Sequence, residues 1–347
     1  MEPLGLGRED PAMCALFANV ARQTPGAASQ GLRYTAAGHL RSILPGLLKY
    51  AARWQSPEER VVTAAVHDAE LGTVKLSALY AKTPGADTLA IVIHGHGGSA
   101  GKPYCHRAAV AARRRGFSTL RISLRGADLR GEDIYHGGLT SDLAAFAGQP
   151  AFVRYRRIVL FGFSIGGHLA LRAALDGIDP RLSAVIAVSP PLDIAAAVEA
   201  LDSPRRWLYR RYIIAGLHRI YAAVDAHGRS RTPLQEVRRA ATFRAWDELT
   251  IVPRFGFRSV DDYYDRITLK HRLGGLCVPA LIVGSNHDPV IPPAVMRDAL
   301  DGASRAVTGC WVDGGGHLHF PAGTGLGFGP VPGLAAQCWS WAGREAL

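Results

Sequence analysis

Short apolar runs recur along the chain at intervals that are typical of strands. Residues 89–94, 158–162, 184–189 and 280–284 are apolar almost throughout, which is typical of strands that are buried on both faces of a sheet. Further strands are expected over 60–66, 73–80, 117–123 and 307–312. The first two of these are expected to form an antiparallel pair with a turn near Gly72.

Helical patterns lie between these runs. Apolar residues recur at helical spacing over 102–115, 139–146, 167–175 and 293–300, and a short last helix is expected over 334–344. Strands that alternate with helices predict a mostly parallel sheet, here of eight strands, with helices on both faces.

One connection is much longer than an ordinary crossover. Residues 190–279 separate the sixth expected strand from the seventh, are rich in Trp, Tyr, Arg and Ala, and have helical patterns. We interpret residues 191–275 as a helical lid over the carboxyl ends of the strands, where open α/β sheets place their sites. Residues 56–347 are then one domain that carries the lid, and residues 1–55 are a partly helical N-terminal extension.

The strongest chemical motif is a serine in a glycine-rich turn. Gly162-Phe163-Ser164-Ile165-Gly166 follows an apolar strand and precedes a helix, which is the context that a G-x-S-x-G nucleophile turn requires. Small residues let the chain turn sharply enough to present the hydroxyl of Ser164, and the N-terminal amides of the helix favour developing negative charge. Ser164 is therefore the predicted nucleophile.

A serine hydroxyl needs a base, and in this arrangement the base follows the last strand. Three glycines, 314–316, precede His317 there, and a flexible turn of this kind lets an imidazole reach back toward Ser164. His317 is the predicted base, and His319 is the alternative.

The acid that orients the base is expected after the seventh strand. Asp288 is the carboxylate of the loop 285–292, and its task is to accept the imidazole N–H and stabilise the imidazolium. Asp193, which follows the sixth strand, is the rival.

The amide of Ile165, directly after the nucleophile, is one predicted oxyanion donor. The amide of His96, in the glycine-rich loop 94–98, is the second, with Gly97 as its alternative. A metal bound by His94, His96 and His106 is a weaker interpretation, because no carboxylate or cysteine stands near at ligand spacing. The sequence implies no cofactor and no metal.

The charge and composition of the chain limit the classes of binding partner that we expect. The formal net charge of +11 comes from small arginine clusters without a zinc-finger or aromatic RNA-binding pattern, so we expect no nucleic acid partner. Arginines and aromatic residues over 205–212 allow two interpretations, a patch that contacts an anionic membrane or a solvated helix with buried aromatics. The sequence leaves the oligomeric state open.

Five scattered cysteines without a C-x-x-C pair predict reduced thiols. Neither a signal peptide pattern nor a membrane-spanning run is found. We therefore expect a cytoplasmic protein, with peripheral contact to a membrane as an option.

These motifs together resemble the YheT-like branch of the α/β-hydrolases, from about residue 39 to residue 320. The similar segments are the oxyanion loop 94–99, the segments 124–126 and 135–142, the lid motifs 243–250, 256–257 and 262–264, the acid loop 286–289 and the base loop 315–320. The family usually has a second aspartate where His287 stands, which favours Asp288 as the acid. No chemistry could be assigned to 135–142, beyond a pairing of Arg125 with Asp142.

The resemblance implies the α/β-hydrolase fold and a carboxylesterase or lipase-like activity on a small-molecule ester or lipid. A thioesterase or acyltransferase with the same triad is the alternative enzyme. A catalytically silent binding protein or a membrane-peripheral scaffold would be a non-enzymatic alternative.

Overall fold

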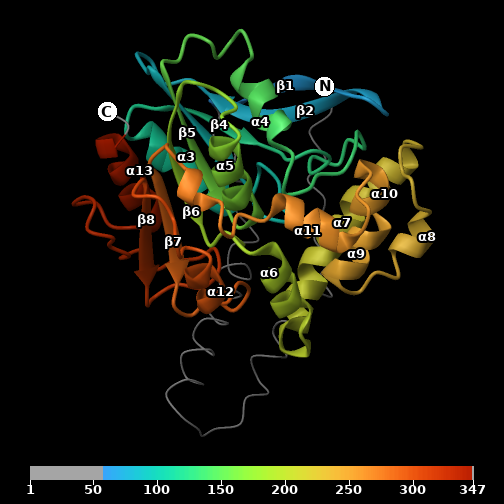
Figure 1. The fold of residues 1–347 in the computed structure, drawn as a ribbon. Coiled ribbons are helices and arrows are strands. Elements are labelled where there is room, and N and C mark those ends of the chain that lie inside the picture. The colour runs from blue at the N-terminus through green and yellow to red at the C-terminus, as the bar shows by residue number, and fades with distance from the viewer. Residues whose placement is uncertain (1–57, 346–347) are drawn as a thin grey trace, which may run out of the picture.

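An eight-stranded sheet runs through the centre of the molecule, in the order β1-β2-β4-β3-β5-β6-β7-β8 (Figure 1). The computed structural model describes residues 58–345, so the extension expected over 1–55 lies outside the described residues. The strands are β1 (Arg60–Asp68), β2 (Gly72–Ala81), β3 (Thr88–Ile93), β4 (Ser118–Ile122), β5 (Arg157–Phe163), β6 (Leu182–Val188), β7 (Ala280–Ser285) and β8 (Val307–Val312).

The sheet is mostly parallel, as predicted. β1 pairs with β2 and β2 with β4 in antiparallel fashion, and all further pairings, from β4 through β3 to β8, are parallel. Every residue of β3 is buried. Helices cover both faces of the sheet, so neither face of this strand meets solvent and its side chains are apolar on both sides. The carboxyl ends of the parallel strands therefore meet at one edge.

Two apolar cores lie on the two faces of the sheet. Along β3, Leu89, Ile91 and Ile93 belong to one core, and Ala90 and Val92 belong to the other. Helices α4 (Thr140–Ala147), α5 (Ile165–Leu175) and α12 (Pro293–Asp298) contribute to the first core, and α3 (Pro103–Arg113) and α13 (Leu334–Glu345) to the second.

Helix α13 closes the second core against α3. Trp339 of α13 is fully buried, its indole N–H donates to the carbonyl of Ala108 at 2.8 Å, and its ring contacts Phe117 and Phe161. One face of the sheet therefore depends on a helix that lies far along the chain from α3.

The connection from β6 to β7 contains helices joined by short loops and no strand, and is called the helical insertion below (residues 190–279). Figure 1 shows its helices gathered beside the sheet, in yellow-green to orange. They are α6 (Ile194–Asp202), η1 (Pro204–Arg206), α7 (Trp207–Ala226), α8 (Leu234–Val237), α9 (Phe243–Leu249), α10 (Ile251–Phe255), α11 (Val260–Ile267) and η2 (Leu273–Gly275). Side-chain caps from Asp193, Thr242 and Ser259 begin α6, α9 and α11.

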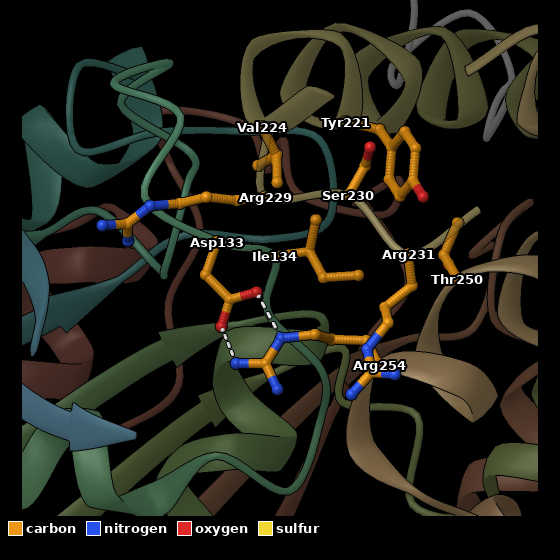
Figure 2. A pocket seen from close by; sticks show the side chains of 9 residues that line it. All are labelled: Asp133, Ile134, Tyr221, Val224, Arg229, Ser230, Arg231, Thr250 and Arg254. Carbon is orange, nitrogen blue, oxygen red and sulfur yellow. Dashed lines mark hydrogen bonds and ion pairs between the residues drawn. The ribbon is translucent and has the colours of Figure 1, made fainter. Parts of the chain in front are cut away.

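A buried ionic cluster fastens this insertion to the sheet. Arg254 of α10 donates to both carboxylate oxygens of Asp133, at 2.9 and 2.8 Å, and to Asp68 at 2.7 Å. Figure 2 shows Arg254 facing Asp133 beside a small cavity between α7, α10 and the loop of Asp133. Arg125 shares Asp133 and also contacts Asp142 at 2.6 Å, which confirms the pairing expected from the sequence.

Among the helices within 58–345, none is long and apolar enough to span a lipid bilayer.

Candidate active site

Ser164 occupies a strained turn between β5 and α5. Its φ of 52° and ψ of −123° lie in a region that L-residues rarely adopt. A Cβ on Gly162 would overlap the carbonyl of Gly166, and a Cβ on Gly166 would stand 2.5 Å from the carbonyl oxygen of His94. Glycine is therefore required at both positions, and the turn presents Ser164 at the carboxyl edge of the sheet.

The structure brings His317 and Asp288 together. Nδ1 of His317 lies 2.8 Å from Oδ2 of Asp288, and both side chains are buried. The other carboxylate oxygen of Asp288 accepts the amides of Val290 and Ile291, at 2.8 and 3.0 Å. These amides hold the carboxylate in place, so the carboxylate fixes the orientation of the imidazole.

Two buried serines hold the loop of His317 against the strand ends. Ser189, directly after β6, donates its hydroxyl to the carbonyl of His317 at 2.8 Å, and Ser285 at the end of β7 donates to Gly315 at 2.9 Å. The amide of Ser164 donates at 2.8 Å to the carbonyl of Val188, the neighbour of Ser189. The nucleophile turn and the base loop are thus tied to the end of the same strand, β6.

The loop after β3 lies beside Ser164. A Cβ on Gly95 would stand 3.2 Å from Cβ of Ser164 and 3.6 Å from Leu318. The amide of Gly97 donates to the hydroxyl of Tyr135 at 2.9 Å, so this amide already has an acceptor. Of the two alternatives for the second oxyanion donor, the geometry therefore favours the amide of His96.

Tyr135 also contacts the side chain of His96. Its hydroxyl lies 3.1 Å from Nδ1 of His96, and the two rings stack with their centroids 5.5 Å apart. Because that hydroxyl oxygen accepts the Gly97 amide, its proton is available to Nδ1 of His96. Burial lowers the pKa of His96 to about 3. This low pKa is consistent with a neutral imidazole whose Nδ1 accepts the proton of the Tyr135 hydroxyl.

His94 is fully engaged with the backbone. Its Nδ1 donates to the carbonyl of Gly95 at 2.7 Å, and its Nε2 accepts the amide of Leu124 at 3.0 Å. Burial lowers the pKa of this histidine to about 4. With both ring nitrogens in use, His94 fastens the loop 94–98 to the end of β4 and has no nitrogen left for a metal.

The rival residues have other roles. Asp193 accepts the amide of Ala196 at the start of α6, and its second oxygen pairs with Lys270 at 2.9 Å. The carbonyl of His319 accepts the amide of Gly316 at 2.9 Å and closes the base loop. It is His317 that the structure joins to Asp288.

Helix α7 crosses above these loops. Arg206, just before α7, donates to the carbonyl of Pro289 at 3.0 Å, beside the acid. Further along, a Cβ on Gly216 would stand 2.9 Å from the Cα of Gly97. The helix therefore extends from the acid loop to the loop after β3, and Ser164 and His317 are only 9% and 8% exposed.

Sequence reasoning missed Tyr135 and Ser189. Tyr135 lies in a segment without periodic pattern, and its contacts with His96 and Gly97 come from the fold. A faint signal for Ser189 was its place at the end of a buried strand, where the structure gives it a φ of 49°.

Comparison with known proteins agrees with this architecture. The sequence matches the family described as Alpha/beta hydrolase family over residues 90–324. Among curated relatives, YheT of Escherichia coli is 27% identical over 300 residues, which cover 82% of this chain and 85% of YheT. Phospholipase ABHD3 of Bos taurus is 27% identical over 167 residues, 47% of this chain and 40% of that protein.

Among solved structures, an esterase of Pyrococcus furiosus is 15% identical and covers 75% of this chain and 82% of its own, with a TM-score of 0.48. The expected resemblance to the YheT-like branch is confirmed by the similarity to YheT, which spans most of both chains. The matched family covers well over half of the sequence and includes the nucleophile turn, the acid loop and the base loop. The chain belongs to the alpha/beta hydrolase family.

Proposed function

We propose that this protein is a serine hydrolase that cleaves carboxylic esters, with Ser164 as nucleophile, His317 as base and Asp288 as the orienting acid. The observation that carries the proposal is the 2.8 Å contact between His317 and Asp288 at the strand edge where Ser164 sits in its strained turn. Similarity to a protein named phospholipase supports an ester or lipid as the substrate class.

The proposed reaction has two acyl-transfer steps. Oγ of Ser164 attacks the ester carbonyl while Nε2 of His317 takes its proton, and the tetrahedral oxyanion is held by the amides of Ile165 and His96. His317 then protonates the leaving alcohol as the acyl-enzyme forms. Water, deprotonated by the same imidazole, attacks the acyl-enzyme and releases the acid, which restores Ser164.

The position of α7 supports a lid role for residues 191–275. Access to a serine that is only 9% exposed requires the overlying segment to move or to leave a narrow path. Within the insertion, α7 is the part that lies over both the acid loop and the loop after β3.

The test is hydrolysis of p-nitrophenyl esters from acetate to dodecanoate by the wild type and by Ser164→Ala. Loss of the nucleophile is expected to lower kcat by about a million-fold, because a triad acts as a unit. A matched control is Ser183→Ala, since Ser183 lies on β6 and its hydroxyl only donates to the carbonyl of Ile158. This control is expected to keep wild-type turnover.

A fluorophosphonate probe separates a wrong substrate from an inert site. Labelling of the wild type but not of Ser164→Ala supports the nucleophile even if none of the esters is cleaved. Equal turnover by the two chains, or equal labelling, contradicts the proposal.

A further inference from the structure

The outer face of α7 carries an unusual combination of side chains. From Trp207 to Asp225 its exposed residues are Trp207, Arg211, Tyr212 and Arg219. The inner face carries Leu208, Ile214, Leu217 and Ile220, which are buried in the core. The helix is therefore amphipathic, and between Trp207 and Asp225 its exposed residues are two aromatic residues and two arginines.

Trp207 and Tyr212 are unusual in this molecule because their aromatic side chains are exposed. Among the described residues, the large apolar side chains that are exposed are three valines, Trp207 at 42% and Tyr212 at 37%. The only aromatic members of this set thus stand five positions apart on one helix. Exposed rings of Trp and Tyr are typical of surfaces where one end of the side chain is apolar and the other meets water.

The charged side chains of this stretch of chain have a single sign. Between Ser203 and Val224 the chain has five arginines and no carboxylate. No ion pair of Arg205, Arg211 or Arg219 occurs within residues 58–345. The carbonyl of Val237 contacts His218 of α7 at 3.1 Å, so the neighbouring exposed residues Arg238 and Arg239, together with the exposed Glu236, adjoin this surface.

We propose that this outer face of α7 docks on an anionic lipid surface. An amphipathic helix with Trp on one side and arginines beside it lies in the plane of a membrane interface, where apolar burial and attraction to anionic headgroups add. The exposed aromatics also favour this interpretation of residues 205–212 over a solvated helix whose aromatics are all buried.

The same helix lies over the candidate site with its other side. Arg206 is fastened to Pro289 beside Asp288, and Gly216 packs on Gly97. A bilayer that binds the outer face is therefore separated from Ser164 by one helix, so docking presents the site to lipid. The binding itself does not depend on the proposed hydrolysis and can be measured without turnover.

The experiment is co-sedimentation of the full chain with vesicles of phosphatidylcholine and with vesicles of phosphatidylcholine and phosphatidylglycerol. We expect binding to the anionic vesicles that weakens as salt rises. Arg211→Glu is expected to lower the partition constant by about tenfold or more. Trp207→Ala is expected to lower it by about fivefold through lost apolar contact, at low and high salt alike.

Matched controls lie at the amino end of β5, whose carboxyl end carries Ser164. The loop before β5 carries Val153, which is 61% exposed, and the exposed Arg156. Arg156→Glu changes the net charge as Arg211→Glu does, and Val153→Ala removes exposed apolar surface as Trp207→Ala does. Both controls are expected to bind like the wild type.

Several outcomes overturn the proposal. These are the absence of binding to anionic vesicles, equal binding to both kinds of vesicle, or an equal loss in Arg156→Glu and Arg211→Glu. Displacement from the vesicles by RNA at matched ionic strength would assign the surface to nucleic acid instead. Ester hydrolysis by a chain that fails to bind would leave the proposed function intact and reject only the docking surface.

Discussion

The carboxylate of Asp288 has a different task from the nearby carboxylate of Asp193, although both follow strands at the same edge. Asp288 is bonded to His317 and to two backbone amides, whereas Asp193 caps a helix and pairs with Lys270. Only the first arrangement can hold an imidazole in one tautomer and stabilise its charged form.

Replacing Asp288 by Asn is therefore expected to lower kcat by about ten-thousandfold, because the amide favours the wrong tautomer of His317. The measurement is steady-state hydrolysis of a p-nitrophenyl ester. Asp193→Asn serves as the matched control and should keep kcat, at a loss of about 1 kcal/mol or less in stability at the helix start. A comparable loss of kcat in both variants would make Asp193 the acid or show that neither residue orients the base.

Tyr135 acts on the loop after β3 through one hydroxyl group, which accepts Gly97 and contacts His96. Tyr135→Phe keeps the ring and removes those bonds. We expect kcat to fall by about ten- to a hundredfold with KM nearly unchanged, because a displaced amide weakens stabilisation of the oxyanion rather than of bound substrate.

The control for this variant is Tyr80→Phe, since the hydroxyl of Tyr80 pairs with Tyr155 in the core. It should lower the melting temperature without changing kcat. If Tyr135→Phe instead lowers only the melting temperature, the residue is structural and does not position the loop.

Among the elements, α7 and the loop after β3 meet at two glycines. Gly97 has a φ of 63°, and its Cα lies so near Gly216 that a side chain at either position would force the two segments apart. The insertion is therefore in direct backbone contact with the loop that carries His96, a candidate oxyanion donor, and a shift of the helix moves this loop with it.

Gly216→Ala tests this contact. Alanine favours a helix over glycine by about 1 kcal/mol, yet its Cβ would stand 2.9 Å from Gly97. We expect kcat to fall by about tenfold or more, whatever happens to the melting temperature. Gly343→Ala in α13 makes the same substitution where no atom lies within 4 Å and should leave kcat unchanged; an equal kcat in both variants would rule out the coupling.

At this scale the sequence pattern was most informative for the strands. All eight expected strands are present, and β8 (Val307–Val312) has the predicted bounds. β6 ends one residue early, because Ser189 turns away with a positive φ. Periodicity reports local burial, so it identified the strands and the helical character of the insertion but not the separate helices within it.

The candidate site was partly predictable because three of its residues follow predicted strands. Ser164, Asp288 and His317 each follow a strand, and the common edge of a parallel sheet brings them near one another. The contact of Tyr135 with Gly97 spans 38 residues and depends on the path of an irregular loop. No local pattern encodes such a path, so this residue could only be found from the structure.

For the whole molecule, burial of neutral histidines sets the response to acid. Burial lowers the pKa of these side chains from 6.5 to between about 3 and about 4; they are His94, His96, His136 and His168. Between pH 6.5 and about 4 the unfolded chain takes up protons that the folded chain does not. These four histidines therefore lower the free energy of unfolding as pH falls through this window.

Each such histidine contributes up to about 1.4 kcal/mol per pH unit. His168 is suited to the test, because it lies in α5 and its Nδ1 donates to the carbonyl of Pro191. In His168→Gln, the free energy of unfolding measured by urea denaturation at several pH values should vary less steeply between pH 6 and pH 5. A slope as steep as that of the wild type would contradict the prediction.

The packing of Trp339 against α3 also has a consequence for folding during synthesis on the ribosome. Its indole is bonded to Ala108, whose helix is translated 231 positions earlier. Until the ribosome has released Trp339, the apolar face beneath α3 has no cover and remains open to chaperones or to other nascent chains. Closure of this core therefore waits for the synthesis of α13, and docking of this helix ends the period in which the apolar face beneath α3 is exposed.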